Sequence, residues 1–373
     1  MIPFLLSIVI SILIAVGSIG GADAADRYLW IIRDQLASPA AIEALVGDAA
    51  ELGATDLLVQ VRGRGDAYYR SSLVPRRDER FDALATLMAA AHARRLRVHA
   101  WFNVFLVGSA DDALHVANAH PGWIARWEDG RSIAEIPKSE RGELFLEGAF
   151  LSPASPPARG HLLDVVSELV ERYALDGLHW DYVRFPGPKG GFESDALQAF
   201  AAREALDHPS WEEWRAEQVS LFVREAGERA RAARPGIVLS AAVMPDPDDA
   251  FQLYGQDWTT WVRELWIDRA IPMSYTTSME RLARWREQAI SADLPPERVL
   301  VGLGVWKLSA TELDAQMEWA DANVPGGVAL FSWGDLSSAG DRAGASVRAE
   351  TTRRVARRAV VSRRWSPATG AAP

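Results

Sequence analysis

Cysteine is absent from this chain of 373 residues. Disulfide bonds, paired-cysteine metal sites and a lipidated N-terminal cysteine are therefore excluded. Basic residues are outnumbered by acidic ones, since the chain has 40 lysines and arginines but 50 aspartates and glutamates, and its formal net charge is −10. This balance argues against nucleic acid as the main ligand. The sequence has no glycine-rich phosphate loop after the first predicted strand, no nicotinamide-binding fingerprint and no paired-cysteine metal site, so neither a cofactor nor a metal ion is expected.

Lysine and arginine are also missing at the start of the chain, before an apolar run over residues 2–19. The run is followed by Ala22, Asp23 and Ala24, a small-x-small ending typical of signal peptidase cleavage. We expect residues 1–24 to be a signal peptide. Because the run is nearly long enough to span a bilayer, an uncleaved membrane anchor is the alternative. The protein is therefore expected to be exported, to the periplasm or the extracellular space.

The rest of the chain alternates between short apolar runs and amphipathic helical patterns. The predicted strands are 28–33, 56–62, 96–103, 175–181, 237–244, 268–275, 299–306 and 327–333. The predicted helices are 39–52, 81–94, 161–174, 211–233, 259–264, 279–292, 309–322 and 345–360. Such alternation predicts an α/β fold with a parallel sheet and right-handed crossovers.

Eight strand–helix units predict a single (β/α)₈ TIM barrel over residues 25–360, with a long loop after the third strand. A doubly wound open sheet is the alternative fold. Residues 341–373 hold eight arginines against two acidic residues. We expect residues 361–373 to be a basic, flexible tail.

The most informative segment is LDGLHWDYVRFP at residues 175–186, where a short apolar strand ends in a carboxylate. Strand alternation puts His179 and Asp181 on one face and Leu178 and Trp180 on the other. Two ionisable side chains at the end of a buried strand carry a desolvation cost. A functional site explains that cost better than a structural His–Asp pair.

The same alternation directs further polar and aromatic side chains toward the C-terminal mouth of the barrel, where barrel enzymes place their sites. Indole rings suit sugars, since they combine a large apolar face with an N–H donor. The predicted substrate-binding residues are Arg62, His99, Trp101, Asn103, His179, Arg184, Tyr275, Trp306 and Trp333. The segment 104–159 is expected to wall one side of the cleft, with Trp123 and Trp127 as distal platforms, or to pack on itself.

Seven motifs, in order along the chain, resemble the glycosyl-hydrolase-like family 10 of bacterial envelope barrels. They are VQVRGRGDAYY at 59–69, VHAWFN at 98–103, HPGW at 120–123, DGLHWDYVRFP at 176–186, GQDW at 255–258, IPMSY at 271–275 and VALFSW at 328–333. The resemblance implies a TIM barrel that acts on cell-wall glycan or another polysaccharide. Many relatives carry two adjacent acidic residues where this chain has Asp181 and Tyr182. A role for the second acid is therefore not implied here.

Glycoside hydrolysis usually needs two carboxylates that flank the scissile bond. Related barrels carry a nucleophile or stabilising carboxylate at the position of Asp181, and Arg184 or Arg62 is expected to keep it ionised by lowering its pKa. Asp246, after the fifth strand, is predicted to be the acid partner. Asp66 is the next choice, although it can instead brace the glycine-rich turn. Asp335 is the third, although it can instead cap a helix. Retaining and inverting mechanisms both stay open.

Two other functions fit the sequence. The barrel can bind glycan without cleaving it, which needs no paired acid. A metal-dependent hydrolase or deacetylase would use His99, His179 and Asp181 as ligands. The expected partner is therefore a polysaccharide or a peptidoglycan-type glycan, with no nucleic acid, and with a membrane only through residues 1–24.

Overall fold

The computed structural model describes residues 25–77, 80–108, 115–337 and 345–365. Eight parallel strands form one sheet in the order β6-β5-β4-β3-β2-β1-β8-β7. They are β1 (Asp26–Ile31), β2 (Asp56–Arg62), β3 (Arg97–Asn103), β4 (Gly177–Asp181), β5 (Val238–Val243), β6 (Arg269–Pro272), β7 (Val301–Gly304) and β8 (Gly327–Phe331). Two isolated parallel bridges, from Ala270 to Val299 and from Met273 to Gly302, close the ring. The predicted TIM barrel is confirmed.

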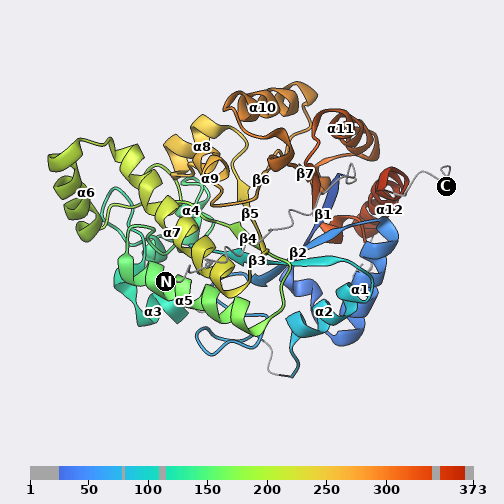
Figure 1. Ribbon diagram of the computed structural model, residues 1–373, viewed down its shortest axis with the longest axis horizontal. Coiled ribbons are helices and arrows are strands. Elements are labelled where there is room, and N and C mark those ends of the chain that lie inside the picture. The colour runs from blue at the N-terminus through green and yellow to red at the C-terminus, as the bar shows by residue number, and fades with distance from the viewer. Residues whose placement is uncertain (1–24, 78–79, 109–114, 338–344, 366–373) are drawn as a thin grey trace, which may run out of the picture.

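Helices alternate with the strands along the chain and surround the barrel (Figure 1). The predicted ones are α1 (Pro39–Leu52), α2 (Ala83–His92), α5 (Pro156–Arg172), α7 (Trp211–Ala233), α9 (Trp258–Arg263), α10 (Met279–Ser291), α11 (Ala310–Asn323) and α12 (Ala345–Trp365). Additional helices are α3 (His115–Ala119), α4 (Lys138–Arg141), α6 (Ser194–Asp207) and α8 (Pro247–Tyr254). Six short 3₁₀ turns complete the described elements, namely η1 (Arg33–Gln35), η2 (Pro121–Trp123), η3 (Ile133–Glu135), η4 (Pro296–Arg298), η5 (Val305–Lys307) and η6 (Trp333–Asp335).

Local capping explains why the helix boundaries follow from the sequence. The Ser38 side chain accepts a hydrogen bond from the Ala41 N–H at the start of α1, and Pro39 takes the first helical position. Gly53 ends this helix with φ 87°, a left-handed conformation that suits glycine. At the start of α7, Ser210 and Glu213 form a reciprocal capping box.

The apolar core has two parts. A large cluster fills the space between the strands and the surrounding helices. A smaller cluster lies inside the barrel and consists of Tyr28, Trp30, Leu58, Trp101, Ile271, Leu300 and Ala329. The interior of the barrel is therefore packed with side chains, as in other barrels of this size.

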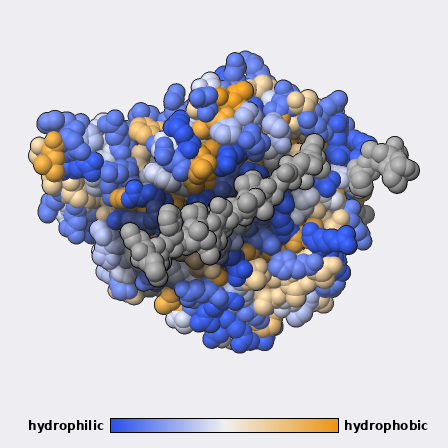
Figure 2. Space-filling view, viewed as in Figure 1, coloured by the Kyte–Doolittle hydropathy of each residue, from blue (hydrophilic) through white to orange (hydrophobic). Residues whose placement is uncertain are grey.

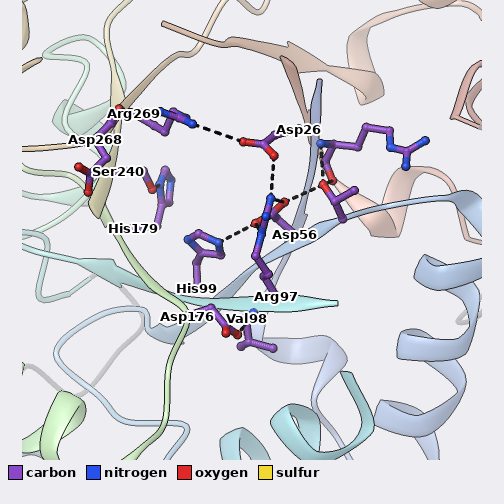
Figure 3. Close-up of polar contacts among 12 residues, drawn as sticks. Asp26, Asp56, Arg97, Val98, His99, Asp176, His179, Ser240, Asp268 and Arg269 are labelled. Carbon is purple, nitrogen blue, oxygen red and sulfur yellow. Dashed lines mark hydrogen bonds and ion pairs between the residues drawn. The ribbon is translucent and has the colours of Figure 1, made fainter. Parts of the chain in front are cut away.

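A polar network fills the N-terminal end of the barrel (Figure 3). The fully buried Asp56 carboxylate accepts hydrogen bonds from Arg97 Nε at 2.6 Å and Arg97 Nη2 at 2.7 Å, and lies 2.8 Å from His99 Nε2. Arg97 also donates to Asp26 at 2.7 Å. Burial raises the pKa of Asp56, but the hydrogen bonds from His99 and Arg97 outweigh it and bring the pKa down to about 2.

The helix α12 extends five residues beyond the predicted end of the barrel. Val361 is fully buried and Trp365 is 3 % exposed, because both side chains pack into the core. The expected start of the flexible tail at residue 361 is therefore wrong. Residues 366–373 and the predicted leader at 1–24 lie outside the described residues.

The surface seen in Figure 2 is mainly hydrophilic, with apolar residues in small separate groups. Among the residues that the structure describes, no helix is long and apolar enough to cross a membrane.

Candidate active site

A cavity of about 1130 Å³ opens at the C-terminal ends of the strands. The strand ends contribute the side chains of Gln60, Trp101, Asn103, Asp181, Tyr275 and Phe331. The long segment after β3 contributes Leu106, Trp127 and all of residues 141–147. The prediction that this segment walls the cleft is confirmed. Trp127 lines the cavity, whereas Trp123 stacks on His120 with ring centroids 3.8 Å apart and does not.

Asp181 ends β4 and is 8 % exposed. Its Oδ1 accepts a hydrogen bond from the Tyr182 N–H at 2.7 Å, and its Oδ2 accepts one from Trp101 Nε1 at 3.0 Å. Both hydrogen bonds favour the ionised form, but burial outweighs them and raises the pKa of the Asp181 carboxyl to about 6. A carboxyl group with this pKa takes up and releases protons close to neutral pH.

The expectation that an arginine keeps Asp181 ionised is wrong, because the net shift of its pKa is upward. A β-bulge between Gln60 and Arg62 breaks the alternation of β2 and turns the Arg62 side chain away from the barrel interior. The buried Arg62 guanidinium lies 4.8 Å from the centre of the Phe102 ring and donates to the Val104 carbonyl at 3.1 Å. Its predicted substrate contact is therefore excluded.

Arg184 lines the cavity as predicted, but it forms its ion pair with Glu147. The Arg184 Nη2 and Glu147 Oε2 atoms are 2.7 Å apart, and the guanidinium lies 5.0 Å from the centre of the Tyr182 ring. Arg184 therefore lowers the pKa of Asp181 only in part, because burial and the negative charge of Glu147 oppose it.

Glu147 is a second carboxylate at the cavity, and the sequence argument missed it. Its side chain is 50 % exposed and lines the same cavity as Asp181. Its charge contributes to the raised pKa of Asp181, after the larger effect of burial. A signal for Glu147 is present in the sequence, because this residue falls in the segment 104–159, which is expected to wall the cleft.

Asp246, the predicted acid partner, does not line the cavity. Its side chain caps α8, where it accepts hydrogen bonds from the N–H groups of Asp248 and Asp249 at 3.1 and 3.3 Å. It also accepts one from Gln288 Nε2 at 3.0 Å. The carboxylate that follows the fifth strand thus starts a helix.

The two other predicted acids also lie outside the cavity lining. Asp66 accepts hydrogen bonds from the Arg64 N–H at 2.8 Å and from Arg77 Nε at 2.6 Å, so it braces the glycine-rich turn. Burial raises the pKa of Asp66, but these hydrogen bonds outweigh it and the net shift is downward. Asp335 accepts hydrogen bonds from the N–H and hydroxyl of Ser332, at the start of the 3₁₀ turn η6 (Trp333–Asp335).

His179 lies below the cavity and is fully buried. Its Nε2 accepts a hydrogen bond from Trp30 Nε1 at 3.1 Å, and its Nδ1 lies 2.9 Å from Ser240 Oγ. Burial lowers the pKa of His179 to about 3, so the ring is neutral and its proton is on Nδ1. His179 orients Trp30, which lines the cavity, and the predicted direct contact with substrate is wrong.

His99 lies deeper still, in the network around Asp56. Alternation assigned both histidines to the correct face, but a side chain two or four residues before the strand end lies one or two layers down the barrel. The structure does not bring His99, His179 and Asp181 together as metal ligands. Within the described residues, no group of three histidine or acidic side chains could hold a metal ion.

The predicted aromatic contacts divide into three groups. Trp101 and Tyr275 line the cavity, together with Asn103. Trp306 is 50 % exposed but lies outside the cavity lining. Trp333 is buried and donates from Nε1 to Asp48 Oδ2 at 2.6 Å, so it packs toward α1 and its predicted role in substrate binding is wrong.

The family described as glycosyl hydrolase-like 10 matches residues 25–321. The glycosyl hydrolase YngK of Bacillus subtilis (strain 168) is 23 % identical over 304 residues, which cover 71 % of this chain and 55 % of the relative. The glycosyl hydrolase DigH of Escherichia coli (strain K12) is 23 % identical over 317 residues, which cover 77 % of this chain and 64 % of the relative. This chain thus spans less than two thirds of the length of either relative.

Two solved structures have a similar fold. The glycoside hydrolase domain of PgaB (BpsB) from Bordetella bronchiseptica has a TM-score of 0.66 at 15 % identity, over 91 % of this chain and 99 % of that domain. The alpha-L-fucosidase isoenzyme 2 from Paenibacillus thiaminolyticus has a TM-score of 0.62 at 15 % identity, over 90 % of this chain and 49 % of that protein. At these identities the similarity concerns the fold alone.

Proposed function

Because this chain belongs to the glycosyl hydrolase-like 10 family, we propose that it is a glycoside hydrolase that cleaves a polysaccharide at the cavity around Asp181. The observation that carries the proposal is the buried Asp181 carboxyl, whose pKa is raised to about 6, beside the second carboxylate of Glu147. The cavity exceeds the range of about 300–1,000 Å³ that is usual for small-molecule sites, which favours an oligomeric substrate.

The two carboxyl groups take complementary roles in this proposal. Protonated Asp181 gives its proton to the leaving glycosidic oxygen as the bond to the anomeric carbon breaks. Glu147 acts on the opposite side, either as the base that activates water or as the nucleophile. This assignment makes Asp181 the acid and replaces Asp246 by Glu147. The burial of Asp181 supports it, because burial favours the protonated form.

We also propose that the protein is exported through residues 1–24 and that its substrate is an envelope polysaccharide, such as peptidoglycan glycan chains. The apolar run before Ala24 supports export. The relatives YngK and DigH, both described as glycosyl hydrolases, support a glycan substrate.

The test uses Asp181→Asn and Glu147→Gln, with Asp246→Asn as a matched control outside the cavity. The purified proteins are incubated with peptidoglycan, with and without its peptide stems, and with α- and β-glucans. Asp181→Asn and Glu147→Gln are each expected to slow cleavage roughly a thousandfold or more, which corresponds to about 4 kcal/mol of barrier. The control is expected to keep nearly the wild-type rate.

A substrate with a good leaving group separates the roles of the two carboxylates, because it needs little help from an acid. Asp181→Asn is expected to cleave it much better than a substrate with a poor leaving group, whereas Glu147→Gln is expected to lose activity on both. Wild-type turnover by Asp181→Asn would contradict the proposal. Binding of glycan by the wild type without any cleavage would indicate a glycan-binding barrel.

A further inference from the structure

Residues 141–148 form an arch over the cavity, and both of its ends are fixed. At one end the buried Arg141 donates from Nε to the Ile136 carbonyl at 2.8 Å. At the other end a Cβ on Gly148 would lie 1.7 Å from the Gly108 carbonyl oxygen, so only glycine fits at this position. Residues 141–147 line the cavity.

Phe145 stands out in the arch for its exposure and its backbone. It is 87 % exposed, the highest value for any large apolar side chain in the described part of the chain. Its φ is 54°, in the left-handed region that bulky residues rarely adopt. The next residue, Leu146, is only 6 % exposed. The arch therefore directs a leucine inward and leaves a phenylalanine ring at the rim of the cavity.

Both features are unfavourable in the isolated protein. An aromatic ring gains free energy when it leaves water, and a non-glycine residue in the left-handed region is strained. Leu206 is comparably exposed, at 81 %, but it lies on the helix α6 and does not line the cavity. Leu265 also combines exposure, at 50 %, with a left-handed φ of 59°, but it does not line the cavity. What distinguishes Phe145 is therefore its position in the cavity lining, where a ligand can cover the ring and offset the strain.

We propose that Phe145 is a platform on which a sugar ring of the polymer stacks at the rim of the cavity, so that long glycan chains bind better than short ones. This inference rests on the proposed function. The C–H face of a sugar is apolar and matches an aromatic ring. Glu147 lies two residues further along the same arch and forms an ion pair with Arg184. A sugar on Phe145 would thus lie near the carboxylate that the proposed function places at the scissile bond.

The experiment compares Phe145→Ala with Phe145→Tyr, and uses Leu206→Ala as the control for an exposed apolar side chain elsewhere. All are made in the Asp181→Asn background, so that binding is measured without cleavage. The probes are peptide-free peptidoglycan strands, α-glucan and β-glucan, each with its own tetrasaccharide fragment. Phe145→Ala is expected to weaken binding of the recognised polymer about 3- to 10-fold and to leave tetrasaccharide binding unchanged.

Phe145→Tyr keeps the ring and is expected to bind as Asp181→Asn does, as is Leu206→Ala. Equal effects of Phe145→Ala on the polymer and the tetrasaccharide, or no effect on either, would overturn the platform. If the wild type binds a polymer but cleaves none, the hydrolase proposal fails while the comparison at Phe145 still applies. If no probe binds, both proposals are overturned.

Discussion

Asp181 owes its chemistry to the atoms packed around it. Two hydrogen-bond donors, the Tyr182 N–H and the Trp101 indole, hold its two oxygens. Burial among cavity residues raises its pKa to about 6. The carboxyl orientation is therefore fixed before substrate arrives. Such preorganisation is what a proton transfer to a glycosidic oxygen requires.

Removal of the indole donor is expected to shift the pH dependence of the proposed glycan cleavage. Trp101→Phe keeps an aromatic ring but loses the hydrogen bond to Asp181 Oδ2, which favours the ionised carboxyl. The pKa of Asp181 should rise further, and the pH profile of kcat/KM should move to higher pH. Trp127→Phe, at another cavity position, is the control. An unchanged profile for Trp101→Phe would contradict this role.

Trp101→Ala is less informative than Trp101→Phe, although the sequence predicts that Trp101 binds substrate. The structure shows that Trp101 is 4 % exposed and belongs to the cluster inside the barrel. Its truncation is expected to cost about 3–5 kcal/mol of stability, as for other buried aromatic residues. Loss of folding would then hide any loss of binding.

The raised pKa of Asp181 also predicts how stability depends on pH. An unfolded aspartate has a pKa of about 3.9, so between that pH and about 6 the folded state binds more protons than the unfolded state. Stability is therefore lost as the pH rises through this range, by up to about 3 kcal/mol. Asp181→Asn cannot ionise and should be more stable than the wild type at pH 8, but similar to it at pH 4. Urea unfolding at both pH values measures this, and a constant difference would contradict it.

Strands and most helices could be predicted from the sequence because their signals are local. Ser38 and Gly53 mark the two ends of α1, and alternation marks the inward faces of the strands. The bulge before Arg62 could not be predicted, since a bulge exists only relative to the neighbouring strand. The depth of His99 and His179 in the barrel also depends on strand pairing, which the sequence does not state.

The candidate site was predicted where strands supply it and missed where a loop supplies it. Asp181, Trp101 and Tyr275 follow from strand ends. Glu147 lies in the arch, far from any strand end, and only the fold brings it to the cavity. Asp246 follows a strand, but the proline after it starts a helix, and the carboxylate becomes its cap.

The cap at α8 gives a direct test of this reassignment. Asp246→Ala is expected to lower the free energy of unfolding by about 1 kcal/mol, because the N–H groups of Asp248 and Asp249 lose their acceptor. Asp246→Ser, which can still cap, should recover most of that loss. Both variants should keep full activity when folded. A selective loss of activity on poor leaving groups would instead restore Asp246 as the acid.

At the scale of the whole barrel, the residues of the candidate site and the residues expected to stabilise the fold lie at opposite ends of the barrel axis. The cavity with Asp181 lies at the C-terminal end of the strands, and the network of Asp56, Arg97 and His99 lies at the N-terminal end (Figure 3). In barrels of this kind, polar residues at the N-terminal face serve stability.

Asp56→Asn is therefore expected to reduce stability by about 3 kcal/mol or more, because it removes the charge paired with Arg97 in a buried site. The kcat/KM of the folded protein should be unchanged. Since the folded pKa of Asp56 is about 2 and the unfolded value is about 3.9, the wild type should lose about 2–3 kcal/mol as the pH falls from 4 through 2. The variant should lack this acid-dependent step.

Asp129→Asn, in an exposed pair with Arg131, is the matched control and should change little. Acid unfolding of Asp56→Asn along the same curve as the wild type would contradict the role given to Asp56. Loss of activity in the folded variant would do the same.

The ring of strands is not equally strong all the way round. Each of its other neighbouring pairs forms a ladder of at least four paired residues, with a bulge only between β2 and β3, whereas β6 and β7 are joined by the two bridges at Ala270 and Met273. Local opening of a protein begins where few backbone hydrogen bonds hold it, so the barrel is expected to open first between β6 and β7. This junction borders the cavity, since Gly304 of β7 packs against the Tyr275 ring. A bulky chain that widens the cavity would meet the least resistance on this side.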